Sequence, residues 1–243
     1  MAAVVAAGRR VLPRGWADFG LQLGIWLGFY VSYFAVRSLA DRNPAKAFAN
    51  GLRVISFEQR TTHHLFEQTA QQVAQSSHLL LTAAGWTYWN SEFTVVGLAL
   101  LWVYLRRHER FHRFRNTILL ANVLGLGGYM IWPTAPPWFF TTYFVDGSSH
   151  GGGLLAFFGN PYAAMPSLHA ADALIVGATL FAACRRWWAK AVWALWPAWV
   201  WFCVIATANH FLLDVLAGIC VAVASLLAVR LAPRARPLIA NLL

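Results

Sequence analysis

The stretch AVWALWPAWVWFCVIATANHFLLDVLAGICVAVASLLAV, residues 191–229, is apolar along nearly its whole length. Polar side chains around Asn209 and His210 divide it into two apolar runs, 191–208 and 211–229. A run of about 18 apolar residues or more can cross the hydrocarbon core of a bilayer as an α-helix. The stretch therefore predicts two membrane-spanning helices that meet beside a histidine.

Four further apolar runs repeat this pattern, at about residues 19–36, 79–105, 116–132 and 167–184. The chain is 59% hydrophobic and 12% charged, whereas a soluble domain usually carries about a quarter charged residues. We therefore expect an all-α integral membrane protein with six transmembrane helices. Residues 1–243 would form a single membrane domain, because little of the chain is left for a soluble one.

Basic residues between the apolar runs indicate the orientation. Six spans place four basic clusters on one side of the membrane, namely the amino terminus and residues 106–115, 185–190 and 230–236. Because Lys and Arg are enriched in cytoplasmic loops, we expect both termini in the cytoplasm. The segment 37–78 and the loop 133–166 then lie outside, and this loop contains no Lys or Arg.

The external segment 37–78 allows two interpretations, because it is basic despite its predicted position. We favour a pair of amphipathic helices that lie in the membrane interface. Alternatively, some of its cations face an anionic substrate. Those cations are Arg37, Arg42, Lys46, Arg53 and Arg60.

The second apolar run contains a polar interruption, WTYWNSE at residues 86–92. This interruption predicts two helical pieces or a broken helix. An acidic side chain at membrane depth, here Glu92, must face protein or a water-filled cavity, because exposure to lipid is costly.

The formal net charge of +10 does not indicate nucleic-acid binding, because the cations do not form a stripe with interleaved aromatic residues. They fit anionic lipid headgroups instead. Cys184, Cys203 and Cys220 lie inside apolar runs without metal-type spacing. We expect no metal and no cofactor. The arginines before the first run suggest an uncleaved signal anchor.

Polar groups gather in NPYAAMPSLHAADAL, residues 160–174. Pro166 suits the first position of a helix, where its missing N–H group is not needed. The N–H groups of Ser167, Leu168 and His169 would then lack partners within the helix. Together with the helix dipole they predict an anion-binding helix start, to which the Ser167 hydroxyl adds a donor.

The second polar cluster is TANHFLLDVLAG, residues 207–218. His210 and Asp214 are four residues apart and share one helix face. A carboxylate there can accept the N–H of one imidazole nitrogen and leave the other nitrogen free as a nucleophile or base. Alone, such a pair is more often structural.

The predicted topology brings His169 and His210 to the same outer face. Burying two histidines and an aspartate near a bilayer costs several kcal/mol unless they are paired or functional. We therefore expect one joint site. Asp172 either orients His169 or faces the cavity, and its role stays open.

Three stretches, PTAPPW (133–138), NPYAAMPSLH (160–169) and NHFLLDVLAG (209–218), resemble the type 2 phosphatidic acid phosphatase (PAP2) superfamily. The resemblance runs over roughly residues 115 to 220. It is strongest to the branch that contains inositol phosphorylceramide synthase-like phosphotransferases.

The resemblance implies a two-step displacement at phosphorus. His210 would attack the phosphoryl group and form a phosphohistidine, with Asp214 orienting it. His169 would protonate the leaving oxygen and later deprotonate the acceptor. The substrate-binding residues implied are Ser167, Pro166, Leu168, Asn160 and Asn209.

Two cations of the family pattern are missing. Trp138 and Val204 stand where many members have Arg, and the family's first motif, a Lys and an Arg before a Pro, is not recognisable. Phosphoryl transfer relies on cations that neutralise charge. The segment Arg37 to Arg60 is an alternative source of such cations, and without one the activity would be weak or different.

The sequence thus predicts a membrane phosphotransferase or phosphatase that acts on a lipid-linked phosphate at the outer membrane face. The acceptor would be an alcohol headgroup or water. The expected location is a bacterial inner membrane. A transporter or anion-binding protein with buried His and Asp is the alternative, although no repeat between the two halves supports it. A metal site on the same three residues is a further alternative.

Overall fold

The computed structural model describes residues 12–39, 43–146 and 162–232. The long helices are α2 (Gly15–Leu39), α7 (His108–Ile131), α9 (Leu168–Ala183), α10 (Trp187–Ala206) and α11 (Leu212–Leu231). The shorter elements are α3 (Pro44–Thr62), α4 (Phe66–Gln75), α5 (His78–Asn90), the π-helix η1 (Ser91–Val95), α6 (Val96–Arg106) and the 3-10 helix η2 (Pro137–Phe139). In these ranges the only strand-like pairing is one isolated bridge, so the predicted all-α class is confirmed.

Some predicted features lie outside the described residues. They are Arg9, Arg10, Arg42, the part of the predicted external loop at residues 147–161 that includes Asn160, and the basic residues from 233 onwards.

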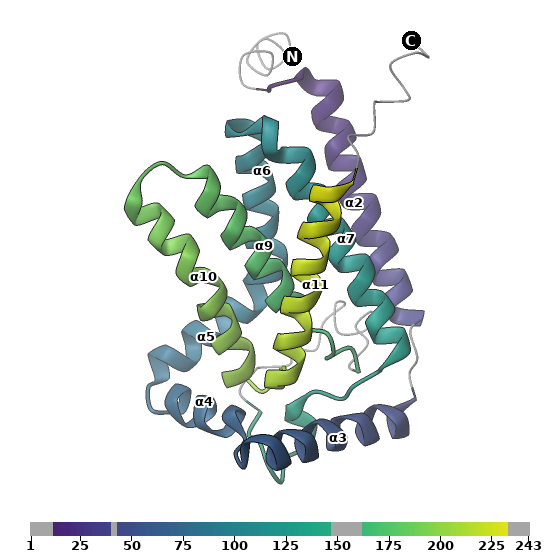
Figure 1. Cartoon of the computed structure of the whole chain (residues 1–243), viewed down its shortest axis with the longest axis vertical. Helices are drawn as coiled ribbons and strands as arrows, with labels where there is room; N and C mark the ends of the chain where they lie inside the picture. The colour runs from purple at the N-terminus through teal and green to yellow at the C-terminus, as the bar shows by residue number, and fades with distance from the viewer. Residues whose placement is uncertain (1–11, 40–42, 147–161, 233–243) are drawn as a thin grey trace.

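The long helices run roughly side by side along the length of the molecule (Figure 1), and each predicted apolar run coincides with helix. The expected run 116–132 is the least accurate, because α7 already begins at His108. Hydropathy marks only the apolar part of a helix, and the basic residues before it continue the same helix. By length and hydropathy, two helices in the described ranges are candidate membrane spans, α10 and α11.

The second apolar run is interrupted, as predicted. α5 passes into the π-helix η1 and then into α6 without leaving the helical path. Such π-bulges occur frequently at functional sites. Glu92 lies in η1 and is buried, so this acidic side chain faces protein.

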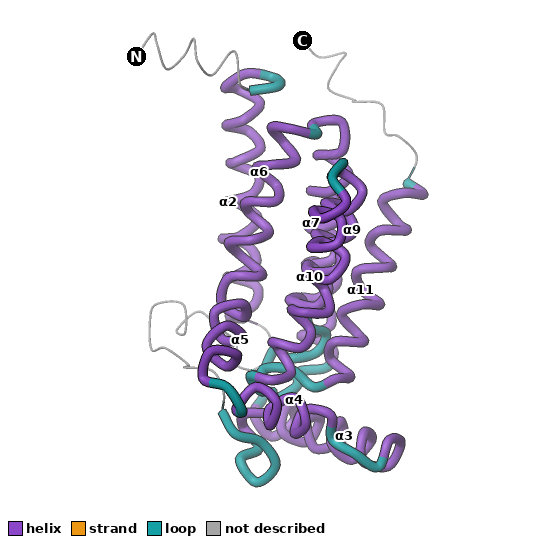
Figure 2. Tube along the Cα trace, turned by 90° about the vertical axis from the view of Figure 1, so that its left-hand side faces the viewer, coloured by secondary structure: helices purple, strands orange, loops and turns teal. Residues whose placement is uncertain are grey.

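The amphipathic helices α3 and α4 lie across one end of the bundle (Figures 1 and 2). Asn43 caps α3 by accepting a hydrogen bond from the Lys46 N–H at 3.1 Å, and Pro44 follows at the first position. The inner face of α3 buries apolar residues against the bundle, whereas Arg53 and Arg60 are exposed. The expected helix pair is therefore present.

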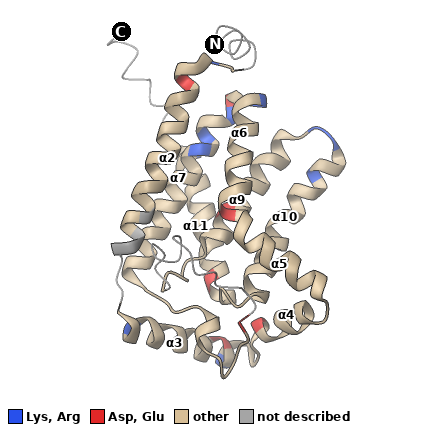
Figure 3. Ribbon diagram, turned by 180° about the vertical axis from the view of Figure 1, so that it is seen from behind, with Lys and Arg blue, Asp and Glu red and all other residues tan. Residues whose placement is uncertain are grey.

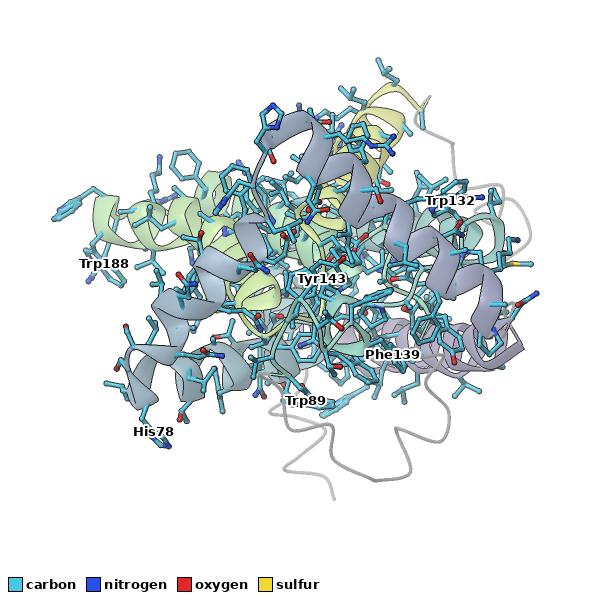
Figure 4. The ribbon with its side chains drawn as sticks, turned by 90° about the horizontal axis from the view of Figure 1, so that it is seen from below. His78, Trp89, Trp132, Phe139, Tyr143 and Trp188 are labelled. Atoms are coloured by element: carbon cyan, nitrogen blue, oxygen red, sulfur yellow. The ribbon has the colours of Figure 1, made fainter. Side chains whose placement is uncertain are left out.

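The two ends of the bundle differ in charge. α2 begins and α11 finishes at the end opposite α3 (Figure 1). Lys and Arg residues gather at that opposite end, around the junction of α6 with α7 and the link from α9 to α10, with a few acidic residues among them (Figure 3). The other acidic residues lie along the middle and near α3 and α4. In the view onto the α3 end, Tyr143 lies near the centre, and His78 and Trp188 lie at the edge (Figure 4).

Three glycines let the backbones of two helices, α7 and α11, approach the start of α9. A Cβ atom on Gly218 of α11 would lie 2.1 Å from the Ser167 carbonyl oxygen. On α7, a Cβ atom on Gly128 would lie 2.4 Å from Cδ of Pro166, and one on Gly125 would lie 2.5 Å from a Leu168 methyl carbon. The segment before α9 is thus held between α7 and α11.

Gly128→Ala should destabilise the protein by about 1–3 kcal/mol, because its methyl group must displace the rigid Pro166 ring. The preceding residue provides a matched control, since a Cβ atom on Gly127 meets nothing within 4 Å. Gly127→Ala should be neutral or stabilise by up to about 1 kcal/mol through higher helix propensity. Thermal unfolding in detergent micelles measures both, and equal midpoints would contradict the packing described.

Candidate functional site

The start of α9 differs from the prediction in one respect. Pro166 does not occupy the first helical position, because the helix begins at Leu168 and Ser167 is the N-cap. The Ser167 hydroxyl oxygen accepts a hydrogen bond from the Ala170 N–H at 3.3 Å. Pro166 follows a cis peptide bond and packs on α7. Ser167 occupies the N-cap position that serine favours, so Pro166 lies in the loop before the helix.

The loop between α10 and α11 is held by its own backbone. The N–H groups of Asn209 and His210 both donate to the Val204 carbonyl oxygen at 3.1 Å, and Ala208 adopts a φ of 60°. The Trp138 N–H donates to the Ala208 carbonyl oxygen at 3.0 Å. Val204 and Trp138 are the two positions where the predicted family pattern has Arg. Here both contribute backbone groups that hold the loop carrying His210.

His210 is oriented by a carbonyl group that the sequence reasoning missed. Its Nδ1 lies 2.9 Å from the carbonyl oxygen of Ala164 and 3.6 Å from Oδ2 of Asp214. A carbonyl oxygen can only accept, so Nδ1 carries a hydrogen, and in the neutral ring Nε2 has the lone pair. The expected carboxylate is present, but the hydrogen bond runs to Ala164. The only sign of Ala164 in the sequence was its position within the motif NPYAAMPSLH.

Asp214 connects the two polar clusters. Its Oδ2 accepts a hydrogen bond from the Phe211 N–H at 2.9 Å, which caps α11. Its main-chain carbonyl oxygen accepts from the Ser167 N–H, also at 2.9 Å. The Ser167 N–H therefore has a partner in another helix, although the sequence predicted it to be free for an anion.

The two predicted histidines lie together. The ring centroids of His169 and His210 are 5.7 Å apart, and the ring planes make an angle of 55°. Both side chains are largely buried, with 12% of the His169 side chain and 6% of the His210 side chain exposed. Both rings can therefore reach one small group between them.

Glu92 is the main site residue that the sequence reasoning did not assign. Its Oε2 lies 3.3 Å from Nε2 of His169, and both side chains are largely buried. The ring of Tyr88 stacks on His169 with a centroid distance of 4.6 Å and an interplanar angle of 17°. The polar interruption WTYWNSE was the available signal, but the spacing could not reveal its partner.

Asp172, whose role the sequence left open, pairs with α7. The side-chain amide of Asn122 lies 3.3 Å from each carboxylate oxygen of Asp172, and both residues are buried. Asn122 also donates to the Ile118 carbonyl oxygen. Asp172 thus anchors α9 to α7 one turn below His169.

The other predicted substrate-binding residues lie around the same point. Pro166, Ser167 and Leu168 are buried in the α7 and α11 contacts. The Asn209 side-chain amide donates to Oγ1 of Thr207 at 2.9 Å, so it stabilises the loop before His210.

Two of the expected cations, Arg53 and Arg60, are exposed on α3. Arg53 donates to Oδ1 of Asn50 at 3.0 Å and lies over the Trp132 ring. The side-chain partners described above for Glu92, Asp172 and Asp214 are His169, Asn122 and His210. In the described ranges, no group of three or more His, Cys, Asp or Glu is placed to hold a metal ion.

Two histidines and an aspartate thus meet where two neighbouring helices begin, at the end of an all-helical bundle. These features define a class, helical proteins with a paired-histidine site. Residues 52–228 match the PAP2 superfamily, and the chain belongs to that superfamily. The match extends further towards the amino terminus than the predicted resemblance, and it includes most of α3 and all of α4 and α5.

Over 139 residues the chain is 29% identical to the phosphoinositol dihydroceramide synthase of Bacteroides thetaiotaomicron. The match covers 49% of this chain and 46% of that relative, which is less than half of each. The crystal structure of Aquifex aeolicus LpxE is similar with a TM-score of 0.51 and 18% identity, over 67% of this chain and 92% of that chain. This likeness shows a shared fold.

Proposed function

We propose that this protein is an integral membrane enzyme that transfers or removes the phosphoryl group of a lipid-linked phosphate. The observation that supports it best is the 5.7 Å separation of the His169 and His210 rings, with Nδ1 of His210 held by Ala164. A nucleophile and an acid that share one phosphorus atom need this arrangement. Membership of the PAP2 superfamily supports the same chemistry.

The reaction would proceed in two displacements. In the first, Nε2 of His210 attacks phosphorus while the bond to the leaving oxygen breaks, and His169 gives that oxygen a proton. In the second, His169 takes the proton of the acceptor hydroxyl as its oxygen attacks phosphorus, and the bond from phosphorus to His210 breaks. The histidines then return to their starting states. The positive charge that forms on His210 would be stabilised by Asp214, 3.6 Å from its Nδ1.

Glu92 would hold His169 in its acid form. Its carboxylate is 3.3 Å from Nε2 of His169, and an adjacent negative charge favours an imidazolium. The stacked Tyr88 ring restricts the ring plane. The acid and the nucleophile would therefore have different partners, a carboxylate at His169 and a backbone carbonyl at His210. Different environments let two histidines of one site act as an acid and as a nucleophile.

The phosphoryl oxygens would bind at the start of α9 rather than at the start of α11. The N–H groups of Leu212 and Leu213 already donate to Oε1 of Glu67 at 2.6 Å and to Oε1 of Glu58 at 3.0 Å. The first turn of α9 carries His169 and offers backbone donors beside it.

Six membrane crossings would be made by α2, the composite helix from α5 through η1 to α6, α7, α9, α10 and α11. Large apolar side chains are exposed on their outer surfaces, including Val31, Leu98, Leu195 and Leu231. A soluble monomer seldom exposes so much apolar surface. The basic end would lie in the cytoplasm, and the site with α3 and α4 would lie at the outer face. A bacterial inner membrane is the proposed location.

The acceptor would be an alcohol headgroup, with water as the second candidate. The similarity to a phosphoinositol dihydroceramide synthase favours transfer. The same two displacements serve both outcomes, because only the hydroxyl that enters beside His169 differs. The substrate would be a phospholipid or another lipid phosphate.

His210→Ala should reduce turnover at least about 1,000-fold, because it removes the nucleophile. Purified protein in detergent is offered phosphatidic acid and phosphatidylinositol, with and without inositol or glycerol as acceptor. Acid-labile phosphate bound to the protein should disappear in the same variant. His78→Ala is the control, since His78 is exposed at the edge of the bundle. Full activity in His210→Ala would exclude the proposed mechanism.

Glu92→Gln should lower kcat about 100-fold and leave KM nearly unchanged, because it weakens acid–base catalysis without touching substrate. The alkaline limb of the pH profile of kcat/KM, which reports loss of the His169 proton, should move to lower pH, because the neighbouring negative charge is gone. Glu109→Gln is the matched control, since this glutamate is exposed at the opposite end. An unaltered kcat in Glu92→Gln would remove Glu92 from the mechanism.

Labelling of single cysteines tests the membrane orientation. Ser76→Cys, at the α4 end, should react in intact cells with a membrane-impermeant maleimide, whereas Glu109→Cys should react only after permeabilisation. Both positions are exposed, and Cys184, Cys203 and Cys220 are first replaced by Ser. The reverse pattern would place the site in the cytoplasm.

A further inference from the structure

Two glutamates from distant parts of the chain cap α11. Oε1 of Glu67 accepts the Leu212 N–H at 2.6 Å, and Oε1 of Glu58 accepts the Leu213 N–H at 3.0 Å. These are the first two N–H groups of the helix, which have no intrahelical partner. Asp214, one residue further, is the partner of His210. The cap thus acts within one turn of the proposed nucleophile.

Both glutamates come from the amphipathic helices at the end of the bundle. Glu58 lies on the inner face of α3, and Glu67 lies in the first turn of α4. They are 4% and 0% exposed, although acidic residues on amphipathic helices normally face water. The glutamate side chains reach from these helices to α11, whereas capping residues within a helix are usually short.

The cap brings the carboxylates of Glu58 and Glu67 close to each other, with Asp214 further away. Oε2 of Glu58, Oε2 of Glu67 and Oδ1 of Asp214 are buried and have no hydrogen-bond partner among the described residues. Burial, the neighbouring Glu67 of α4 and the more distant Asp214 of α11 raise the pKa of Glu58 to about 8, against the lowering effect of its bond to Leu213. The helix dipole favours negative charge here, but it does not offset a second adjacent buried charge. Protonation of Glu58 at neutral pH removes this repulsion.

We propose that Glu58 and Glu67 are positioning residues that fix the start of α11, and through it His210 and Asp214, from the amphipathic cap. This inference rests on the proposed function and adds two residues from outside the motifs that define the site. It makes α3 and α4 part of the catalytic framework. A gap opened between the cap and α11 would release Leu212 and Leu213 and let His210 move relative to His169.

The variants separate hydrogen bonding from charge. Glu67→Ala and the double variant Glu58→Ala/Glu67→Ala remove acceptors, whereas Glu58→Gln and Glu67→Gln keep a carbonyl oxygen for the backbone N–H. We expect at least a tenfold loss of kcat with KM within twofold for the double Ala variant. Each Gln variant should stay within about threefold of wild type at neutral pH. Glu109→Gln is the control.

The pH dependence gives a second readout. A raised pKa in the folded state means that stability is greatest below the unfolded value and falls as pH rises through the folded value. The temperature at which the wild-type protein unfolds should therefore decrease as the pH is raised from about 4.5 to about 8. The unfolding temperature of Glu58→Gln should decrease less over this range, because glutamine cannot ionise. At pH 9 this variant should be more stable than wild type. If the unfolding temperature changed equally with pH in both proteins, the raised pKa of Glu58 would be contradicted.

Amide hydrogen exchange decides the matter without an activity assay. Peptides that contain residues 211–215 should exchange at least tenfold faster in Glu67→Ala than in wild type, while peptides from α7 keep their rate. If wild type acts on none of the lipid phosphates, the proposed function fails and this measurement still tests the cap. Unchanged exchange together with unchanged kcat in folded Ala variants would overturn the positioning role.

Discussion

One main-chain hydrogen bond holds the site together, the bond from the Ser167 N–H to the Asp214 carbonyl oxygen at 2.9 Å. It joins the start of α9 to the start of α11, so the residues that follow each start are placed against each other. Only a glycine at position 218 lets the two backbones come so close. The approach of His169 to His210 depends on this contact.

The acidic residues of this basic protein gather around that contact. The chain has 9 Asp and Glu residues against 19 Lys and Arg. Five of the nine are buried near the two helix starts or on the helices that flank them, namely Glu58, Glu67, Glu92, Asp172 and Asp214. Each accepts a hydrogen bond from a backbone or side-chain N–H group or lies beside a histidine. Buried carboxylates persist where such partners are fixed in advance.

The partners of the two histidines illustrate how far sequence reasoning reaches. Asp214 was predictable as a neighbour of His210 because it follows four residues later, and the interruption at Glu92 was visible as a polar break in an apolar run. The predicted shared helix face was wrong, because α11 begins at Leu212 and His210 lies in the loop before it. The pairing of Glu92 with His169 was not predictable, because it joins η1 to α9 across the bundle. Ala164 escaped notice for another reason, since its contribution is a carbonyl group that every residue has. The same is true of Glu58 and Glu67, which bond to α11 across a sequence separation of 155 and 145 residues.

Local patterns in the sequence predicted the helical class, the approximate positions of the apolar helices and the two histidines that lie together. These features were predictable because hydropathy and residue spacing depend on neighbours in sequence. Only tertiary packing decided the position of Pro166 before the helix, the carbonyl that orients His210 and the carboxylates beside His169 and at α11. Those features depend on which backbone groups meet when α7, α9 and α11 close on one another. Such contacts depend on close backbone approach at glycines and on hydrogen bonds between residues far apart in the sequence. Neither produces a periodic pattern in the sequence.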